Sequence, residues 1–296
     1  MNRTAVHEVS PRDAGDVNSL LALDPPRLVQ EHGVVLFRGF DTDGDAFNSV
    51  VAQVSSKVTI DPARTFHGDS AQLVDSGDES IGLHLENGAT PFAPELLWFH
   101  CVRAAEAGSE TTVCDGRLVH EALSQAARDA FGSQPIRYSR TIAGDKWRRM
   151  ASFMSGGTIS PSDATVEQLA DVVPAGSQFT VEHRGDDALR YTYDVWGVGP
   201  SRWSDQPVWA SSIFGPSYNY EAPTITFRDS SPLSAELLEE CRVATERVTA
   251  DIVWRDGDVV LIDNSRVMHG RRPIIDPRRT IVNAQSYLDE SFVAGA

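Results

Sequence analysis

Seven segments rich in β-branched and aromatic residues run through this chain, and helices do not separate them at regular intervals. Such residues suit the pleated, half-buried surface of a strand. A doubly wound α/β sheet requires regular strand–helix alternation, which is missing in the strand-rich second half. The pattern therefore favours a mainly β fold with flanking helices, built on a jelly-roll core (a double-stranded β-helix). The segments are 33–40, 96–102, 110–116, 190–196, 208–215, 258–264 and 280–288.

Two segments have the apolar spacing of amphipathic helices. Residues 117–131 follow the start signal Asp115-Gly116, and residues 233–250 include Ser234, whose side chain suits an N-cap near the start of that segment. Segments rich in Gly, Ser, Asp and Pro predict loops at 155–165 and 196–207. Neither loop marks a boundary, so we expect a single domain over residues 1–296, with helical and loop insertions. Residues 144–165 mix aromatic and basic side chains with glycines, and they form a candidate lid.

The charge and cysteine content narrow the class of protein. A net charge of −16 and the absence of a basic stripe argue against nucleic-acid or anionic-membrane partners. The three cysteines have no zinc-ribbon spacing, and their small, odd number suits a reducing compartment. No apolar run approaches the roughly 20 residues that cross a bilayer, and the first residues have no signal-peptide core. We expect a cytoplasmic protein that acts on a small molecule.

The stretch IGLHLENG at residues 81–88 places His84 and Glu86 two positions apart in a run that reads as a strand. Their side chains would then project from the same face, and both could reach one ion. A third ligand must come from elsewhere, and His269 follows the strongly apolar segment Val259–Ile262. Two histidines and one carboxylate on one side of an octahedron suit non-haem iron(II) with three open positions. The alternative is a solvated strand face, because most H-x-E tripeptides bind nothing.

Three motifs together resemble the TauD/TfdA-type, clavaminate-synthase-like family of iron(II)- and 2-oxoglutarate-dependent dioxygenases. The motifs are HLEN at 84–87, GSETTVCDG at 108–116 and DGDVVLIDNSRVMHGRR at 256–272, and the resemblance covers roughly residues 30–290. It implies that His84, Glu86 and His269 ligate iron(II), and that 2-oxoglutarate and O2 are cosubstrates. It also implies oxidation of an unactivated C–H bond, by hydroxylation, desaturation or ring closure. Because Glu86 fills the position that halogenases leave open for chloride, halogenation is disfavoured.

The resemblance also implies a pocket for the distal carboxylate of 2-oxoglutarate. The family places an arginine about ten residues after the distal histidine, where this chain has Arg278 and Arg279. Adjacent strand residues point to opposite faces, so one of the two points inward; we favour Arg279, with Arg278 as the alternative. Thr111 in GSETT corresponds to a threonine that binds the same carboxylate, and Thr112 should face the other way. We expect Arg271 and Arg272 to be surface charges in a loop.

Candidate substrate-binding residues lie in two places. The polar segment 64–72 precedes the metal motif, where relatives contact their substrates, and it supplies His67, Asp69, Ser70 and Gln72. Relatives that act on sulfonates have a second arginine four residues after the first, where this chain has Asn283. We therefore disfavour a sulfonate and favour an amino acid or an amino-acid-derived intermediate of natural-product biosynthesis.

Two other functions use the same residues. One is a jelly-roll binding protein that has lost catalysis, and the other is a zinc-dependent hydrolase in which metal-bound water is the nucleophile. The sequence leaves open the identity of the substrate, the outcome after hydrogen abstraction, its stereochemistry and the oligomeric state.

Overall fold

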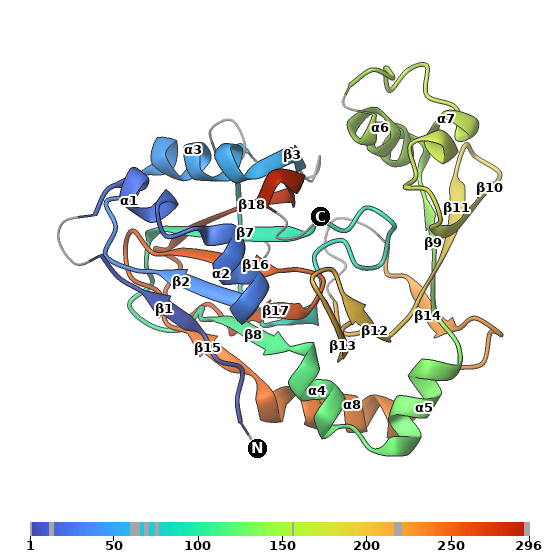
Figure 1. The fold of residues 1–296 in the computed structure, drawn as a ribbon. Coiled ribbons are helices and arrows are strands. Elements are labelled where there is room, and N and C mark those ends of the chain that lie inside the picture. The colour runs from blue at the N-terminus through green and yellow to red at the C-terminus, as the bar shows by residue number, and fades with distance from the viewer. Residues whose placement is uncertain are drawn as a thin grey trace.

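Two β-sheets face each other and form the body of the protein (Figure 1). The computed structural model describes residues 2–11, 15–59, 66–67, 71–74, 77–155, 157–215 and 221–292. The larger sheet contains β1 (His7–Val9), β2 (Val34–Phe37), β16 (Val259–Asp263), β7 (Leu96–Arg103), β18 (Thr280–Leu288), β5 (Ala71–Leu73) and β4 (Phe66–His67) in this order, and β3 (Ser55–Thr59) also pairs with β18. The smaller sheet contains β15 (Ala250–Ile252), β8 (Thr111–Asp115), β17 (Val267–Arg271) and β6 (Ile81–His84). The predicted jelly-roll core is confirmed.

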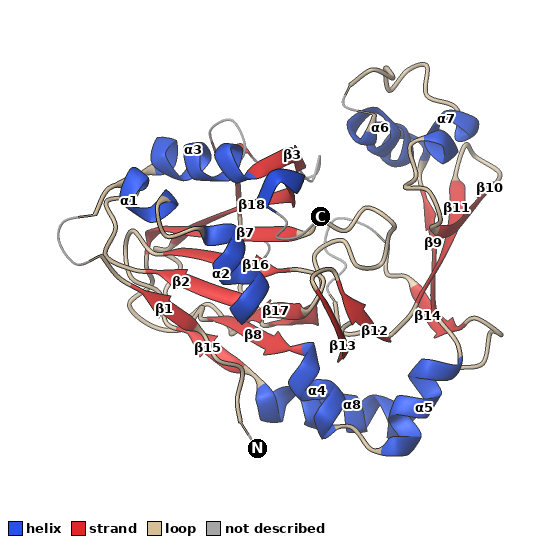
Figure 2. Ribbon diagram, viewed as in Figure 1, coloured by secondary structure: helices blue, strands red, loops and turns tan. Residues whose placement is uncertain are grey.

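The strands are apolar on both faces because both faces are buried. In β16, Val260 and Ile262 belong to the apolar cluster between the sheets, whereas Val259 and Leu261 belong to the cluster beneath the helices. Figure 2 shows helices on the two outer sides of the strands. Against the larger sheet pack α1 (Val17–Leu21), α2 (Pro25–His32) and α3 (Gly44–Val54), and against the smaller sheet pack α4 (Gly116–Ala122), α5 (Gln125–Ser133) and α8 (Ala235–Val248). A short 3-10 helix, η1, spans Glu290–Phe292.

The helix expected over 117–131 is two helices rather than one. Leu123 leaves the helical conformation, and the Ser124 side chain accepts a hydrogen bond from the Ala127 amide at 3.1 Å, which starts α5. The prediction missed this internal cap because the apolar spacing continues across it. The second expected helix is confirmed as α8, and the Ser234 side chain caps it by accepting from the Leu237 amide at 3.2 Å.

An arm stands away from the two sheets at the right of Figure 1. It contains a sheet of β10 (Gln178–His183), β11 (Leu189–Val195), β9 (Ile136–Ile142) and β14 (Thr224–Phe227), with α6 (Gly144–Met154) and α7 (Val166–Asp171). Trp147, Leu189 and Tyr191 lie in an apolar cluster of its own. The lid candidate 144–165 thus comprises α6 and the turn up to α7, and its closing over a substrate stays a prediction.

Two assignments around the arm are wrong. The predicted loop 196–207 forms a hairpin of β12 (Val198–Ser201) and β13 (Ser204–Trp209), and the predicted strand 208–215 ends at Trp209. In the hairpin, Pro200 lies opposite Pro207. Proline is tolerated in strands at edges, so the proline and glycine content that suggested a loop is compatible with a two-stranded hairpin.

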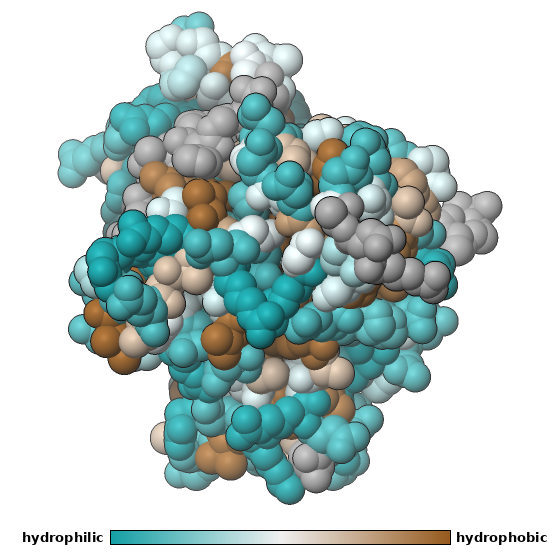
Figure 3. Space-filling model, turned by 90° about the vertical axis from the view of Figure 1, so that its left-hand side faces the viewer, coloured by the Kyte–Doolittle hydropathy of each residue, from teal (hydrophilic) through white to brown (hydrophobic). Residues whose placement is uncertain are grey.

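The large hydrophobic side chains that are exposed in the described part of the chain are Val102, Trp196, Val243, Val253, Ile275 and Phe292. The face in Figure 3 is mainly hydrophilic, with small separate hydrophobic patches. No helix in the described part of the chain is long and apolar enough to cross a membrane. All three cysteines are buried and free, and burial raises the pKa of each thiol to about 12, so they are poor nucleophiles.

A buried ion pair joins the end of β8 to the turn that precedes β17. Arg266 Nε donates to Asp115 Oδ1 at 2.9 Å, and Arg266 Nη2 donates to Asp115 Oδ2. The Gly116 amide also donates to the Arg266 carbonyl at 2.9 Å. The pair therefore holds β17 in register against β8, and β17 carries His269.

We predict that Asp115→Ala lowers the free energy of unfolding by about 3–5 kcal/mol, because it leaves the Arg266 guanidinium buried without its counter-ion. Urea denaturation followed by circular dichroism measures the loss. Glu246→Ala is the matched control, since it breaks the exposed Glu246–Arg272 pair, for which we expect less than about 1 kcal/mol. Equal losses in the two variants would contradict this role of the buried pair.

Candidate metal centre

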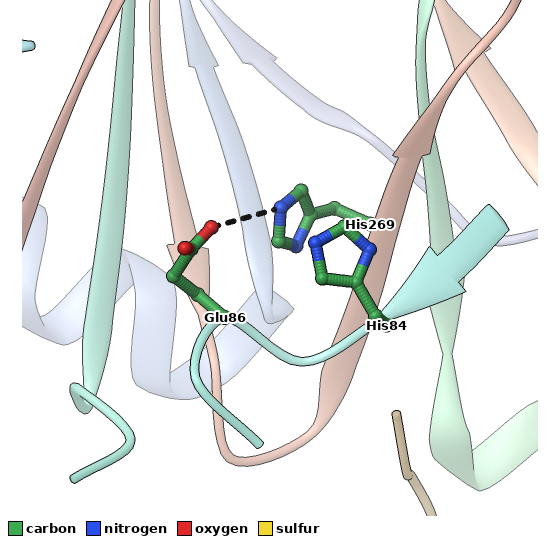
Figure 4. A group of neighbouring side chains, drawn as sticks. All are labelled: His84, Glu86 and His269. Carbon is green, nitrogen blue, oxygen red and sulfur yellow. Dashed lines mark ion pairs between the residues drawn. The ribbon is translucent and has the colours of Figure 1, made fainter. Parts of the chain in front are cut away.

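Three side chains from distant parts of the chain converge between the two sheets. One ligand atom each from His84, Glu86 and His269 lies within 4.8 Å of the others. His269 Nε2 and Glu86 Oε2 are 3.4 Å apart, and the two imidazole rings are 4.2 Å apart between centroids (Figure 4). Neighbouring ligands of an octahedral ion lie about 3 Å apart when the metal bonds are about 2.1 Å. The described residues contain no other such group of histidine, cysteine and carboxylate side chains.

Strand pairing brings the two histidines together. His269 lies opposite His84 in the antiparallel pair of β17 and β6, and opposite Val113 of β8. Gly270 follows on the other face of β17, where a Cβ atom would lie only 2.5 Å from the Ile81 carbonyl oxygen. The absence of a side chain at position 270 therefore lets β6 approach closely enough to pair with β17.

Glu86 reaches the site from a turn rather than from the strand that we expected. The strand β6 ends at His84, and residues 86–89 form a turn in which Asn87 has a φ of 55°. Asn264 holds this turn: its Oδ1 accepts from the Glu86 amide at 2.8 Å, and its Nδ2 donates to the Glu86 carbonyl at 3.1 Å and to the Pro94 carbonyl at 2.8 Å. In the sequence, Asn264 lies within the motif at 256–272, and no local pattern indicated that it holds the turn at Glu86.

The surroundings favour metal binding by these groups. Glu86 and His269 are 5% and 6% exposed, and a buried carboxylate requires a cationic partner. His84 Nδ1 lies 2.9 Å from the Gly82 carbonyl oxygen, to which it can only donate. In the neutral ring the lone pair then lies on Nε2, which is the atom through which this tautomer binds a metal.

The two candidate arginines have different environments. Arg278 is exposed and forms ion pairs with Asp276 and Glu106 at the surface. Arg279 is half-buried, donates to the Val74 carbonyl at 2.7 Å and has no ion pair with any described carboxylate. Burial and, second, the nearby Arg271 lower the pKa of Arg279 to about 10. Of the two arginines, Arg279 is therefore the one that a bound anion would stabilise.

Thr111 lies in β8 opposite Arg271 and is buried. Trp254 Nε1 donates to Thr111 Oγ1 at 3.1 Å, so the hydroxyl hydrogen is left to donate to another acceptor. Thr112 lies opposite Gly270, on the other face of the strand. The expectation that Arg271 is a surface charge is wrong, because β17 continues to Arg271 and its side chain is buried beside Arg279. Arg272 does lie near the surface, paired with Glu246 and Asp251.

Two of the candidate substrate residues lie side by side. Gln72 of β5 is opposite Asn283 of β18, and both are 1% exposed. Asp69, Ser70 and the side chain of His67 lie outside the described residues. Gln285, which we did not predict, lies two positions beyond Asn283, and its Oε1 accepts from Asn87 Nδ2 at 3.0 Å. It therefore links β18 to the turn that carries Glu86.

Comparison with known proteins finds relatives that match most of the length of this chain. Residues 7–285 match the model of the family described as taurine catabolism dioxygenase TauD, TfdA family. A clavaminate synthase-like protein of Arabidopsis thaliana is 26% identical over 280 residues, covering 86% of this chain and 82% of its own length. The dapdiamide synthesis protein DdaC of Enterobacter agglomerans is 23% identical over 273 residues, covering 83% and 80%. The crystal structure of PvcB from Pseudomonas aeruginosa aligns with a TM-score of 0.65 at 15% identity, covering 98% of this chain and 88% of PvcB.

We predict that Asn264→Ala weakens metal binding about 10- to 100-fold, because groups that orient a ligand usually contribute this much to affinity. Titration with Mn(II), followed by the electron paramagnetic resonance signal of free Mn(II), measures the dissociation constant. Asn264→Asp keeps the shape and the acceptor but loses both donated bonds, and we expect it to weaken binding as well. Ser265→Ala in the same turn is the control; wild-type affinity in a folded Asn264→Ala protein would contradict the bracing role.

Proposed function

Because this chain belongs to the TauD/TfdA family of dioxygenases, with residues 7–285 matched, we propose that it is an iron(II)- and 2-oxoglutarate-dependent oxygenase whose iron is held by His84, Glu86 and His269. The observation that carries the assignment of ligands is the convergence of their donor atoms within 4.8 Å inside the jelly roll. Two imidazoles and one carboxylate match the donor set that iron(II) takes in oxygenases of this type.

The iron, 2-oxoglutarate and O2 supply an oxidant strong enough to remove a hydrogen atom from an unactivated C–H bond. The work of the chain is to position the reactants and to keep water out. His84 and His269 bind as neutral imidazoles, and Glu86 contributes one negative charge. The apolar cluster around Phe99, whose ring lies 5.6 Å from that of His269, gives this end of the site a dry wall.

Arg279 and Thr111 are the residues that we propose to bind the distal carboxylate of 2-oxoglutarate. A guanidinium offers two parallel N–H donors to a carboxylate, and the free hydroxyl hydrogen of Thr111 offers a third. The lowered pKa of Arg279 and the absence of an ion pair with any described carboxylate support this role, since a bound carboxylate would supply a counter-charge. Arg271, whose charge also contributes to that lowered pKa, adds to the positive potential at this end of the barrel.

We propose that the substrate is a small, polar amino acid or amino-acid-derived intermediate of a natural-product pathway. The enzyme would convert it to a hydroxylated, desaturated or cyclised product. The relatives support this class. DdaC is named for dapdiamide synthesis, and a second PvcB structure, with a TM-score of 0.62, is described as an iron, 2-oxoglutarate dependent oxygenase from an isonitrile synthetic pathway. The arm carries the lid candidate, and Tyr191 of the arm donates to the Ala89 carbonyl at 3.3 Å, three residues after Glu86.

The two rival functions make different predictions. A zinc hydrolase using the same ligands would have no need for the unpaired Arg279 cation, and it would act without O2 or a keto acid. A binding protein that has lost catalysis would not form succinate. Both rivals are separated from the oxygenase by the measurements that follow.

In wild-type protein, anaerobic addition of iron(II) and 2-oxoglutarate should give a weak visible charge-transfer band, and aerobic turnover should give succinate. We predict that His269→Ala abolishes both, because one of three ligands is lost, while the far-ultraviolet circular dichroism spectrum is unchanged. His183→Ala, on the exposed surface of the arm, should retain the band and the turnover. Activity that depends on zinc and persists without O2 would point to the hydrolase instead.

Arg279→Ala should raise the KM for 2-oxoglutarate about tenfold to a hundredfold, because a charge-assisted bidentate contact is lost. The kcat at saturating 2-oxoglutarate should change less than the KM. Arg278→Ala is the matched control, since its guanidinium bonds to Asp276 and Glu106, and its KM should stay at the wild-type value. The reverse pattern would mean that Arg278 binds the cosubstrate.

A further inference from the structure

The inner face of β18 presents three buried amide atoms that have no hydrogen-bond partner among the described residues. Neither Oδ1 nor Nδ2 of Asn283 has a hydrogen-bond partner in the described part of the chain. Gln285, on the same face, is fully buried, and its Nε2 has no partner there either. Buried polar groups are almost always hydrogen-bonded, to protein, to water or to a ligand. Three such atoms on one strand face therefore indicate a surface that is completed by something bound.

This surface adjoins the metal centre. Asn283 lies opposite Phe99 of β7, and paired residues of adjacent strands project from the same face. The Phe99 ring lies 5.6 Å from that of His269. Gln285 accepts from Asn87, the residue that follows Glu86. A molecule bonded to Asn283 would therefore lie beside the metal ligands, where the substrate has to be.

The described neighbours of Asn283 in the sheet favour a neutral partner over an anionic one. The side chains that surround Asn283 within the sheet, Gln72, Phe99 and Gln285, are all neutral. Arg279 is four residues away along the strand, a rise of about 13 Å. A carboxylate or sulfonate at Asn283 would have no cation among these described neighbours, and burying an anion without a cation is strongly unfavourable. A neutral group with both a donor and an acceptor matches the two unsatisfied atoms of Asn283.

We propose that the primary substrate is a carboxamide, a small molecule whose amide group pairs with Asn283. The substrate N–H donates to Asn283 Oδ1, and Asn283 Nδ2 donates to the substrate carbonyl, while Gln285 Nε2 supplies one more donor. This inference rests on the proposed function, because it concerns the substrate of the same site. It assigns to Asn283 the selection of an amide over the corresponding acid.

Matched pairs of an amide and its acid test the proposal by equilibrium binding. The probes are L-asparagine with L-aspartate, L-glutamine with L-glutamate, and the N-acetyl derivative of each. Isothermal titration calorimetry on protein loaded with Mn(II) and 2-oxoglutarate gives each dissociation constant. We expect the amide to bind about tenfold to a hundredfold more tightly than its acid in at least one pair, since one side of the contact would otherwise lose its hydrogen bonds. In Asn283→Leu this preference should disappear.

Stability supplies a second readout that needs no ligand. Asn283→Leu replaces an unsatisfied buried amide by an apolar group of similar shape, so the ligand-free variant should unfold at the same urea concentration as wild type or a higher one. Ser286→Ala is the control on the other face of β18, where Ser286 accepts from Trp98 Nε1 at 3.2 Å. That variant should keep the preference for amides.

Three results would overturn the proposal: acids that bind as tightly as amides, no binding of any amide in the panel, or a clear loss of stability in Asn283→Leu. The last would mean that Asn283 is bonded within the protein or to ordered water. The charge-transfer band with iron(II) and 2-oxoglutarate alone separates this failure from that of the proposed function. Wild-type protein that forms the band but shows no amide preference contradicts only the substrate class, whereas absence of the band contradicts the oxygenase itself.

Discussion

The pairing of β17 with β6 is the contact on which the candidate site depends. It sets His269 opposite His84, and it is possible because Gly270 leaves room for the backbone of Ile81. A shift of one residue in this register would turn His269 to the outer face of the sheet, since strand side chains alternate. The buried pair of Arg266 and Asp115 fixes the same strand from its other side. The two candidate histidine ligands are thus placed by backbone pairing, whereas the candidate ligand Glu86 is positioned by a separate side chain.

Asn264 illustrates how polar side chains are used inside this barrel. The side chain of Asn264 forms hydrogen bonds with the backbone of Glu86 and Pro94, and so its role is structural. Asn283 has the same chemical group at equal burial, yet both of its polar atoms lack partners among the described residues. Arg278 and Arg279 form a similar contrast: Arg278 pairs with carboxylates at the surface, whereas Arg279 is half-buried and has no ion pair with a described carboxylate. In each contrast, the side chain that lacks a hydrogen-bond or ion-pair partner among the described residues is the one that we propose to bind a ligand.

The elements that could be predicted from sequence are those whose pattern is local and long. The strand expected over 280–288 coincides with β18, and Ser234 starts α8 as expected, because alternation and capping are properties of neighbouring residues. The three metal-ligand candidates were also named from motifs. What sequence could not give depends on distant contacts: the early end of β6, the bracing by Asn264, and the burial of Arg271 through pairing with β8. The internal cap at Ser124 was hidden because the apolar spacing runs through it.

The distance along the chain between His84 and His269 has a consequence for how the protein matures. Their strands are neighbours in space, but most of the polypeptide lies between them. Folds dominated by such remote contacts close large loops before they gain stabilising interactions, and they form slowly. A half-made chain that ends before β17 has two of the three candidate ligands and lacks β17, the described strand with which β6 pairs. The proposed three-residue site is therefore complete only after β17 has joined β6, late in the folding of the chain.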